Sequence, residues 1–109
     1  MVADAALAGA VDRFLAYLRG ERRYAPSTLG HYAHALARLT GFAEAQGLRR
    51  WSELKSDRMQ ALLAEQHRSR RYSPATLRGI ASAWRSFFRY LAREGEVTAN
   101  PAIGLRSPK

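Results

Sequence analysis

The sequence predicts an all-α fold, a compact four-helix bundle made of two crossed helix hairpins and followed by a short C-terminal segment. Alanine, leucine and arginine dominate the composition, while the β-branched residues that favour strands are few. Apolar residues recur at intervals of three and four in four separate stretches, which is the period of a helix face. A chain of 109 residues has room for one core, so we expect all four helices to belong to one domain.

The first two helices are expected to form the first hairpin. Residues 4–20 form the first of them, with Asp4 as a candidate N-cap. Gly47 ends the second helix as a C′ glycine. The apolar face of the first helix consists of Leu7, Val11, Phe14, Leu15 and Leu18. The apolar face of the second consists of Leu29, Tyr32, Ala33, Leu36, Leu39 and Ala43.

The second hairpin follows a short connector that Leu48 and Trp51 anchor. Its first helix begins after the cap candidate Ser56 and gives way to a basic loop at residues 67–71. Its last helix ends at Gly95. The apolar residues of the shorter helix are Met59, Leu62 and Leu63, and those of the last helix are Leu77, Ile80, Ala81, Trp84, Phe87, Phe88 and Leu91. Asn100-Pro101 then indicates a turn, and residues 106–109 are typical of the start of a linker, which leaves 1–105 as the domain.

An internal repeat relates the two hairpins. Residues 22–29 read Arg-Arg-Tyr-Ala-Pro-Ser-Thr-Leu and residues 70–77 read Arg-Arg-Tyr-Ser-Pro-Ala-Thr-Leu, an offset of 70 − 22 = 48 with six of eight positions identical. Gly47 and Gly95 close the two units at the same offset. Because two copies are too few for a solenoid, the repeat predicts one pseudo-duplicated domain.

The repeated helix starts suggest a phosphate receptor. Ser73 is the expected N-cap of the last helix, with Pro74 at the first helical position and Thr76 at the third. The second helix repeats this with Thr28, although Ala25 is a poor cap. A start built for stability alone usually carries acids, and here two arginines precede each start instead, Arg71 among them. Each start therefore leaves its positive end open to an outside anion; the alternative is a hydrophobic staple with a neutral cap.

The charge distribution points to a polyanionic partner. The formal net charge is +9, and 16 of the 18 basic residues are arginine. A GC-rich genome would also raise arginine and alanine, so the position of the charge has to decide. Residues 68–109 hold nine bases and two acids, and no acid occurs from 66 to 93. Arg78, Ser82, Arg85 and Arg89 lie on the outer face of the last helix, which is narrow enough to enter a DNA major groove.

The outer face of the second helix carries His31, His34 and Arg38. The two histidines lack a third ligand at a suitable spacing, so hydrogen bonds to bases or phosphates are favoured over a metal site. Gly30 and Gly79 lie inside helices, where glycine costs about 1 kcal/mol against alanine, which indicates close approach of another helix or of a nucleic-acid backbone. The chain has no cysteine, which excludes disulfides and thiol chemistry. We expect no cofactor and no metal.

Several segments together resemble a known family. They are Arg23 to Leu29 with Tyr32 and Leu36, Arg85 to Leu91, Ala99-Asn100-Pro101-Ala102, and Ser107-Pro108-Lys109. In these residues the chain is similar to the N-terminal core-binding domain of tyrosine site-specific recombinases, with the closest likeness to the XerC type. Many members carry an acid before the leucine of the second helix, where this chain has Ala35.

The resemblance implies a SAM-like domain of four helices that forms half of a clamp around a double-stranded DNA recombination site. Thr28, His31, Thr76 and Arg78 fall at or beside positions where the family contacts DNA. It also implies a parent enzyme that cuts and religates DNA through a phosphotyrosine in strand exchange and chromosome dimer resolution. That enzyme would act in a tetramer with a related, XerD-like subunit. The catalytic domain of that parent is absent here, so this segment is expected to bind DNA without cleaving it. His67 and Arg70 match the family's His-x-x-Arg element in spelling only.

From these arguments the predicted DNA-binding residues are Thr28, His31, Arg71, Ser73, Thr76, Arg78, Ser82 and Arg85. Thr28, Thr76 and Arg71 are assigned to phosphates, and His31, Arg78, Ser82 and Arg85 to the groove. No apolar run approaches the roughly 20 residues of a membrane span, and we expect a cytoplasmic protein without membrane contact. The alternative function is a helical SAM-like protein-interaction domain whose basic face meets an acidic partner. A helix-turn-helix regulator is disfavoured because the helix spacing does not fit.

Overall fold

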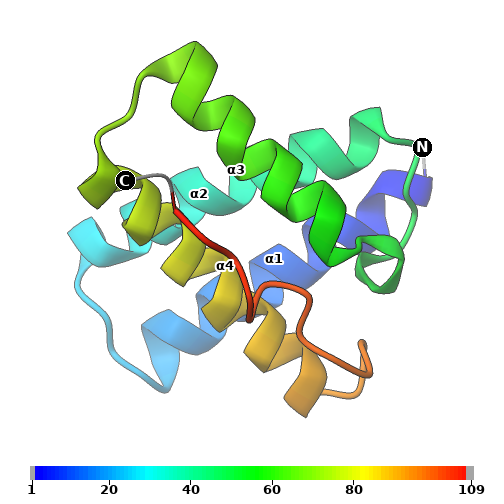
Figure 1. Ribbon diagram of the computed structural model, residues 1–109. Coiled ribbons are helices and arrows are strands. Elements are labelled where there is room, and N and C mark those ends of the chain that lie inside the picture. The colour runs from blue at the N-terminus through cyan, green and yellow to red at the C-terminus, as the bar shows by residue number, and fades with distance from the viewer. Residues whose placement is uncertain (1, 108–109) are drawn as a thin grey trace.

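Four α-helices and one short 3-10 helix make up the part of the chain that the computed structural model describes, residues 2–107 (Figure 1). No strand occurs among these residues, so the predicted fold class is confirmed. The helices are α1 (Val2–Gly20), α2 (Pro26–Ala45), η1 (Trp51–Glu53), α3 (Ser56–Arg70) and α4 (Pro74–Arg93).

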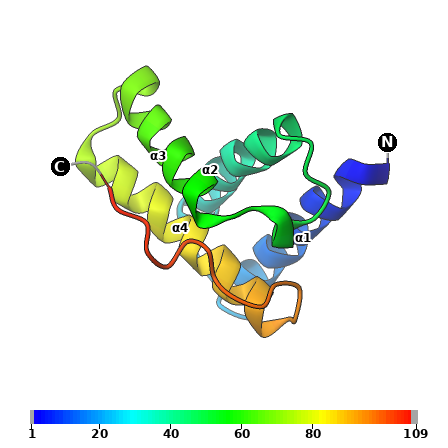
Figure 2. The same cartoon turned by 45° about the vertical axis from the view of Figure 1, so that its right-hand side comes forward.

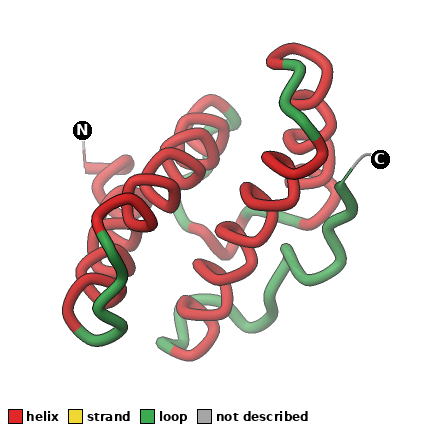
Figure 3. Tube along the Cα trace, turned by 90° about the vertical axis from the view of Figure 1, so that its left-hand side faces the viewer, coloured by secondary structure: helices red, strands yellow, loops and turns green. Residues whose placement is uncertain are grey.

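The helices pair as two hairpins, α1 with α2 and α3 with α4, which lie side by side in Figure 3. Contacts between α2 and α4 join the two pairs, and α1 also touches α4. Figure 2 shows the same arrangement with α4 running past the ends of α1 and α2. The last two helices of the repeat units are therefore the central elements of the domain.

The core lies between the hairpins and consists of the apolar stripes of all four helices. Trp84, Phe14, Phe87 and Phe88 are its largest fully buried side chains. Two tryptophans also donate buried hydrogen bonds: Trp84 Nε1 to the Ala35 carbonyl oxygen at 2.8 Å, and Trp51 Nε1 to the Leu7 carbonyl oxygen at 3.0 Å. These bonds fix α4 against α2, and η1 against α1. Every residue predicted for the apolar stripe of α4 is buried.

The predicted stripes of α1 and α2 need two adjustments. Val11 and Leu15 are only half-buried at the edge of the core. On α2 the stripe was predicted to include Ala33, which is exposed, whereas Ala35 is fully buried. Ala35 faces α4, where its carbonyl oxygen accepts the Trp84 bond. A small residue at this place lets the two helices approach, which explains why an alanine is accommodated there.

The repeat holds in the backbone. Arg23 and Arg71, 48 positions apart, both have φ of 54°, in the left-handed region. Gly47 and Gly95 close α2 and α4 with φ of 75° and 78°, as C′ glycines do. α2 and α4 each have 20 residues and begin with proline after an extended cap residue. The two units are thus duplicates in conformation as well as in sequence.

Three predicted boundaries are wrong. α1 begins at Val2, so Asp4 lies inside the helix instead of capping it. α3 begins at Ser56 itself, and the extended cap residue is Lys55. The segment predicted as a basic loop, residues 67–71, is the last turn of α3 as far as Arg70, followed by the left-handed Arg71. Positive side chains are favourable at the negative end of a helix, which is why this basic run extends α3.

The chain after α4 folds back along the second hairpin, drawn in orange and red in Figure 1. Asn100 holds the turn, since its Nδ2 donates to the Arg85 carbonyl oxygen at 3.1 Å and its Oδ1 accepts from the Ala102 N–H at 2.9 Å. The Gln60 side chain bonds both the N–H and the carbonyl oxygen of Arg106. Residues 108 and 109 of the predicted linker lie outside the described residues.

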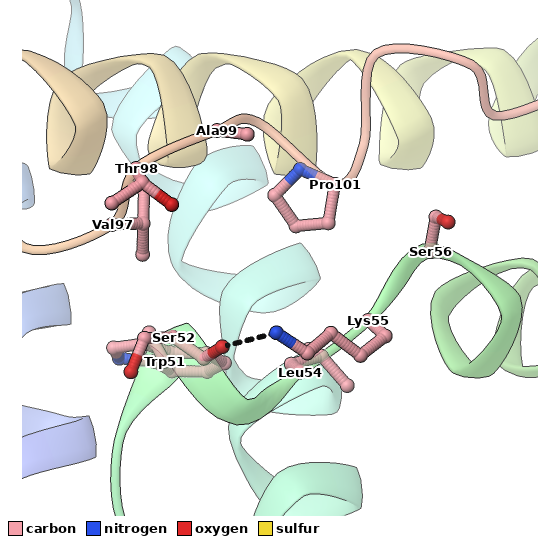
Figure 4. Close-up of a pocket in the computed structure, with 9 residues that line it drawn as sticks. All are labelled: Trp51, Ser52, Leu54, Lys55, Ser56, Val97, Thr98, Ala99 and Pro101. Atoms are coloured by element: carbon pink, nitrogen blue, oxygen red, sulfur yellow. Dashed lines mark hydrogen bonds between the residues drawn. The ribbon is translucent and has the colours of Figure 1, made fainter.

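A shallow pocket of about 190 Å³ lies between this returning segment and η1 (Figure 4). Trp51 and Leu54 line one side, and Val97 and Pro101 the other. Lys55 Nζ donates to the Ser52 carbonyl oxygen at 3.1 Å, so the cation beside the pocket already has a partner. The pocket is a seam between connector and tail, and it carries no cluster of reactive groups.

Candidate nucleic-acid interface

The starts of α2 and α4 lie at the same side of the molecule, the left-hand side in Figure 1. Their closest link is between His31 of α2 and Gly79 of α4, where the imidazole Nε2 lies 3.2 Å from the Gly79 carbonyl oxygen. His31 and the adjacent Arg78 are both exposed. The structure therefore brings these two predicted groove residues together on one surface.

The outer face of α4 is a continuous cationic row. Arg78, Ser82 and Arg89 are exposed and Arg85 is partly buried, while every residue of the opposite stripe is buried. Arg93, one turn beyond Arg89, extends the row to the end of the helix. In the described part of the chain there are two ion pairs, Arg13 with Glu96 and Arg93 with Glu94. The charges of Arg78, Arg85 and Arg89 are thus left without a carboxylate partner.

The two helix starts differ in how their backbone donors are used. At α4, Ser73 Oγ accepts from the Thr76 N–H at 3.2 Å and lies 3.1 Å from the Thr76 hydroxyl. At α2, Ala25 provides no such bond. The expectation that both starts leave all their donors free is therefore wrong for the Thr76 N–H, which Ser73 occupies. Thr28 and Thr76 are both exposed, as is Arg71 just ahead of α4.

Arg38 does not lie on the outer face as predicted. Its guanidinium stacks on the Tyr72 ring, 5.0 Å from the ring centre, and donates to the Tyr72 hydroxyl. Arg38 is half-buried, and its Nε has no hydrogen-bond partner. Tyr72 belongs to the loop between α3 and α4, so Arg38 ties the two hairpins together. His34, by contrast, is exposed as expected.

The two helical glycines have different surroundings. A Cβ added to Gly79 would lie 3.2 Å from Cε1 of the His31 ring and 3.4 Å from its Nε2. Gly79 therefore makes room for a neighbouring helix, one of the two explanations predicted from the sequence. A Cβ added to Gly30 would meet nothing within 4 Å. Gly30 is exposed on the same surface, and nothing in the chain itself requires a glycine there.

Sequence reasoning missed a cluster at the other end of the cationic row. Arg93 Nη1 donates to the Tyr17 hydroxyl at 3.2 Å. The guanidinium of Arg93, and to a smaller extent that of Arg22, lowers the pKa of this hydroxyl. Arg93 continues the four-residue spacing after Arg89, which is the signal that would have found it. Tyr17 comes from α1, a contact between distant segments that no local pattern indicates.

The arrangement defines a class of protein: a pseudo-duplicated four-helix domain with one unpaired cationic face. Comparison with known families matches residues 11–95 to the phage integrase, N-terminal SAM-like domain. The chain belongs to this family. None of its helices in the described part is long and apolar enough to cross a membrane.

Similar proteins of known name agree with this membership. The chain is 40% identical over 99 residues to the tyrosine recombinase XerC of Azotobacter vinelandii, covering 91% of this chain and 33% of that protein. It is 40% identical over 107 residues to the XerC of Xanthomonas campestris pv. campestris strain B100, covering 98% and 33%. For the XerC of Salmonella typhi the values are 38% over 106 residues, 97% and 35%. The chain thus spans about a third of the length of these relatives. A comparison with solved structures found no match.

Proposed function

We propose that this chain is the DNA-binding half-clamp of a site-specific tyrosine recombinase of the XerC type, gripping a double-stranded recombination site with α2 and α4. The observation that carries the proposal is the row of arginines along α4, which have no carboxylate partners and lie beside the exposed start of α2. A field of one sign recruits phosphates. The XerC relatives and the family match support the same function.

The proposed contacts are of two kinds. Thr28, Arg71, Ser73 and Thr76 lie at or just before the two helix starts and hold phosphates, which position the domain. His31, Arg78, Ser82 and Arg85 lie along the helices and reach the base edges of the major groove. Because the Thr76 N–H is taken by Ser73, the Thr76 contact comes from its hydroxyl.

The intact protein would use this domain, residues 1–105, with residues 106–109 leading to a catalytic domain. That domain would cut and religate DNA through a phosphotyrosine, in a tetramer with a related, XerD-like subunit. Chromosome dimer resolution in the cytoplasm is the corresponding role. The size of the XerC relatives, about three times that of this chain, supports a second domain of this kind.

Binding to short duplexes at increasing salt tests the proposal. Affinity should fall by about 0.9 log unit per log unit of salt for each phosphate neutralised. Arg71→Ala should weaken all duplexes about equally and reduce the slope by about one unit. Arg78→Ala should narrow the gap between cognate and random DNA by ~1 to 3 kcal/mol if it contacts a guanine through two hydrogen bonds.

Arg49→Ala is the matched control, since Arg49 is an exposed arginine outside α2 and α4. It should change neither the slope nor the specificity. If the unmodified chain binds no duplex even at low salt, the proposal is wrong and the basic face belongs to a protein-interaction domain with an acidic partner.

A further inference from the structure

A small pocket of about 110 Å³ lies where the end of α1 meets the second half of α4 and the loop before α2. Three arginines line it, Arg22, Arg89 and Arg93, together with three tyrosines, Tyr17, Tyr24 and Tyr90. No lining residue is acidic. The pocket therefore gathers three positive charges from two distant segments without a carboxylate among them.

Aromatic rings hold two of these guanidinium groups. The guanidinium of Arg93 lies 4.7 Å from the ring centre of Tyr17 and 5.7 Å from that of Tyr90, and that of Arg22 lies 5.4 Å from the ring centre of Tyr24. A guanidinium stacked on a ring uses its face and keeps most of its N–H donors, which point outward in its plane. Arg93 uses one donor on the Tyr17 hydroxyl, at 3.2 Å. The remaining donors are oriented and available to an oxyanion.

The neighbouring acids neutralise little of this charge. Glu94 is the only carboxylate paired with a pocket arginine in the described part of the chain, with its Oε2 4.0 Å from Arg93 Nε. Both side chains are about half exposed, at 56% and 47%, and exposed pairs at such a distance contribute little. The lowered pKa of the Tyr17 hydroxyl agrees with a positive potential at this place.

We propose that this pocket binds a backbone phosphate of the DNA duplex, held by Arg22, Arg89 and Arg93. The inference rests on the proposed function, because Arg89 and Arg93 continue the same row of α4 that begins at Arg78. That row covers 93 − 78 = 15 residues, about 22 Å at 1.5 Å per residue. A major groove is about 12 Å wide, so a helix laid in it with Arg78 at base edges brings its far end to the bordering phosphates.

The test uses the whole chain and duplexes in which single phosphates are replaced by neutral methylphosphonates. For the unmodified chain, one replacement should weaken binding roughly tenfold, the equivalent of one charge-assisted hydrogen bond. In the Arg22→Gln/Arg93→Gln variant that same replacement should cost nothing, while replacements elsewhere keep their full effect. The variant should also lower the salt slope by one to two units, at about 0.9 per phosphate.

Three controls make the result decisive. Arg49→Gln removes one exposed charge outside the pocket, and should leave the methylphosphonate pattern unchanged. Tyr17→Phe keeps the ring under Arg93 but removes the hydroxyl that orients it, so it should weaken the same single phosphate contact even if the double variant folds poorly. Thermal melting of each variant, followed by circular dichroism, identifies any loss of fold.

The outcomes separate the pocket from the proposed function. If the unmodified chain binds duplexes but no methylphosphonate effect disappears in the pocket variants, the pocket inference is overturned and DNA binding stands. If the unmodified chain binds no duplex, DNA binding itself is overturned. A shift of the nitrogen-labelled Arg93 side-chain signal with polyglutamate but none with duplex would overturn the DNA assignment in favour of an acidic protein.

Discussion

Replacing the two helical glycines by alanine should have opposite consequences, because only one of them faces another helix. Alanine is better than glycine inside a helix by about 1 kcal/mol. At Gly30 an added Cβ meets nothing within 4 Å and φ is not positive, so Gly30→Ala should receive the whole gain. For a domain of this size, 1 kcal/mol raises the melting temperature by roughly 4 to 8 °C.

At Gly79 the same gain is offset. The new Cβ would lie 3.2 Å from the His31 ring, closer than ordinary contact, so the ring has to move. Moving it breaks the link between His31 Nε2 and the Gly79 carbonyl oxygen, a hydrogen bond worth about 0.5 to 1.5 kcal/mol. The net change in the free energy of unfolding for Gly79→Ala should therefore be close to zero.

Urea and thermal unfolding of the two single variants, side by side with the parent, measure both effects. Adding His31→Ala to Gly79→Ala removes the ring that the Cβ meets, so in that background the alanine should again stabilise by about 1 kcal/mol. If Gly79→Ala alone raises the melting temperature as much as Gly30→Ala does, the α2–α4 contact through His31 does not constrain this position and the reasoning is refuted.

Three further changes test the core, the connector and the start of α2. Trp84→Ala should lower the free energy of unfolding by ~3 to 5 kcal/mol, because it leaves a cavity and an unmatched Ala35 carbonyl oxygen; urea unfolding that matches the parent would place Trp84 outside the core. The pKa of Glu53 is lowered by hydrogen bonds from the backbone N–H groups of Arg49 and Arg50, so its carboxylate stabilises the fold above the ordinary glutamate pKa and this stability is lost as the pH falls through the lowered value. Glu53→Gln should therefore show a smaller loss of urea midpoint between neutral and acid pH, and an unchanged loss would contradict this. Ala25→Ser should supply the missing N-cap of α2 and stabilise by about 1 kcal/mol, and its duplex affinity should fall if the α2 start binds a phosphate with its backbone donors.

Where an element faces the core along its whole length, the sequence was enough to predict it. α4 has large apolar side chains on one side and arginines on the other, and every predicted core residue of α4 is buried. α2 relies on alanines at its contact with α4, and alanine gives a weak periodic signal, so Ala33 was chosen where Ala35 is buried. The end of α3 was missed because a run of basic residues resembles a loop, although those charges suit a helix C-terminus.

The candidate site was predictable only where it follows a single helix. The row from Arg78 to Arg89 needs nothing but the period of α4. The positions of Arg38 and Arg93 depend on tyrosines far away in the sequence, Tyr72 and Tyr17, and no spacing rule connects them. Whether Arg38 is free to contact a ligand is decided by its stacking on Tyr72, which only the folded chain reveals.

The pseudo-duplication also explains why the two halves of the surface have diverged. An offset of 48 makes His31 equivalent to Gly79, and Gly30 equivalent to Arg78. His31 and Gly79 face one another between the hairpins, where two rings would collide and two glycines would leave a gap, so one copy provides the ring and the other the space. Once that pair is fixed, the residues beside it are free to differ. The first unit then presents a bare backbone at Gly30, which a phosphate strand can approach closely. The second presents the long side chain of Arg78, so a duplicated backbone acquires two different tools for one asymmetric stretch of DNA.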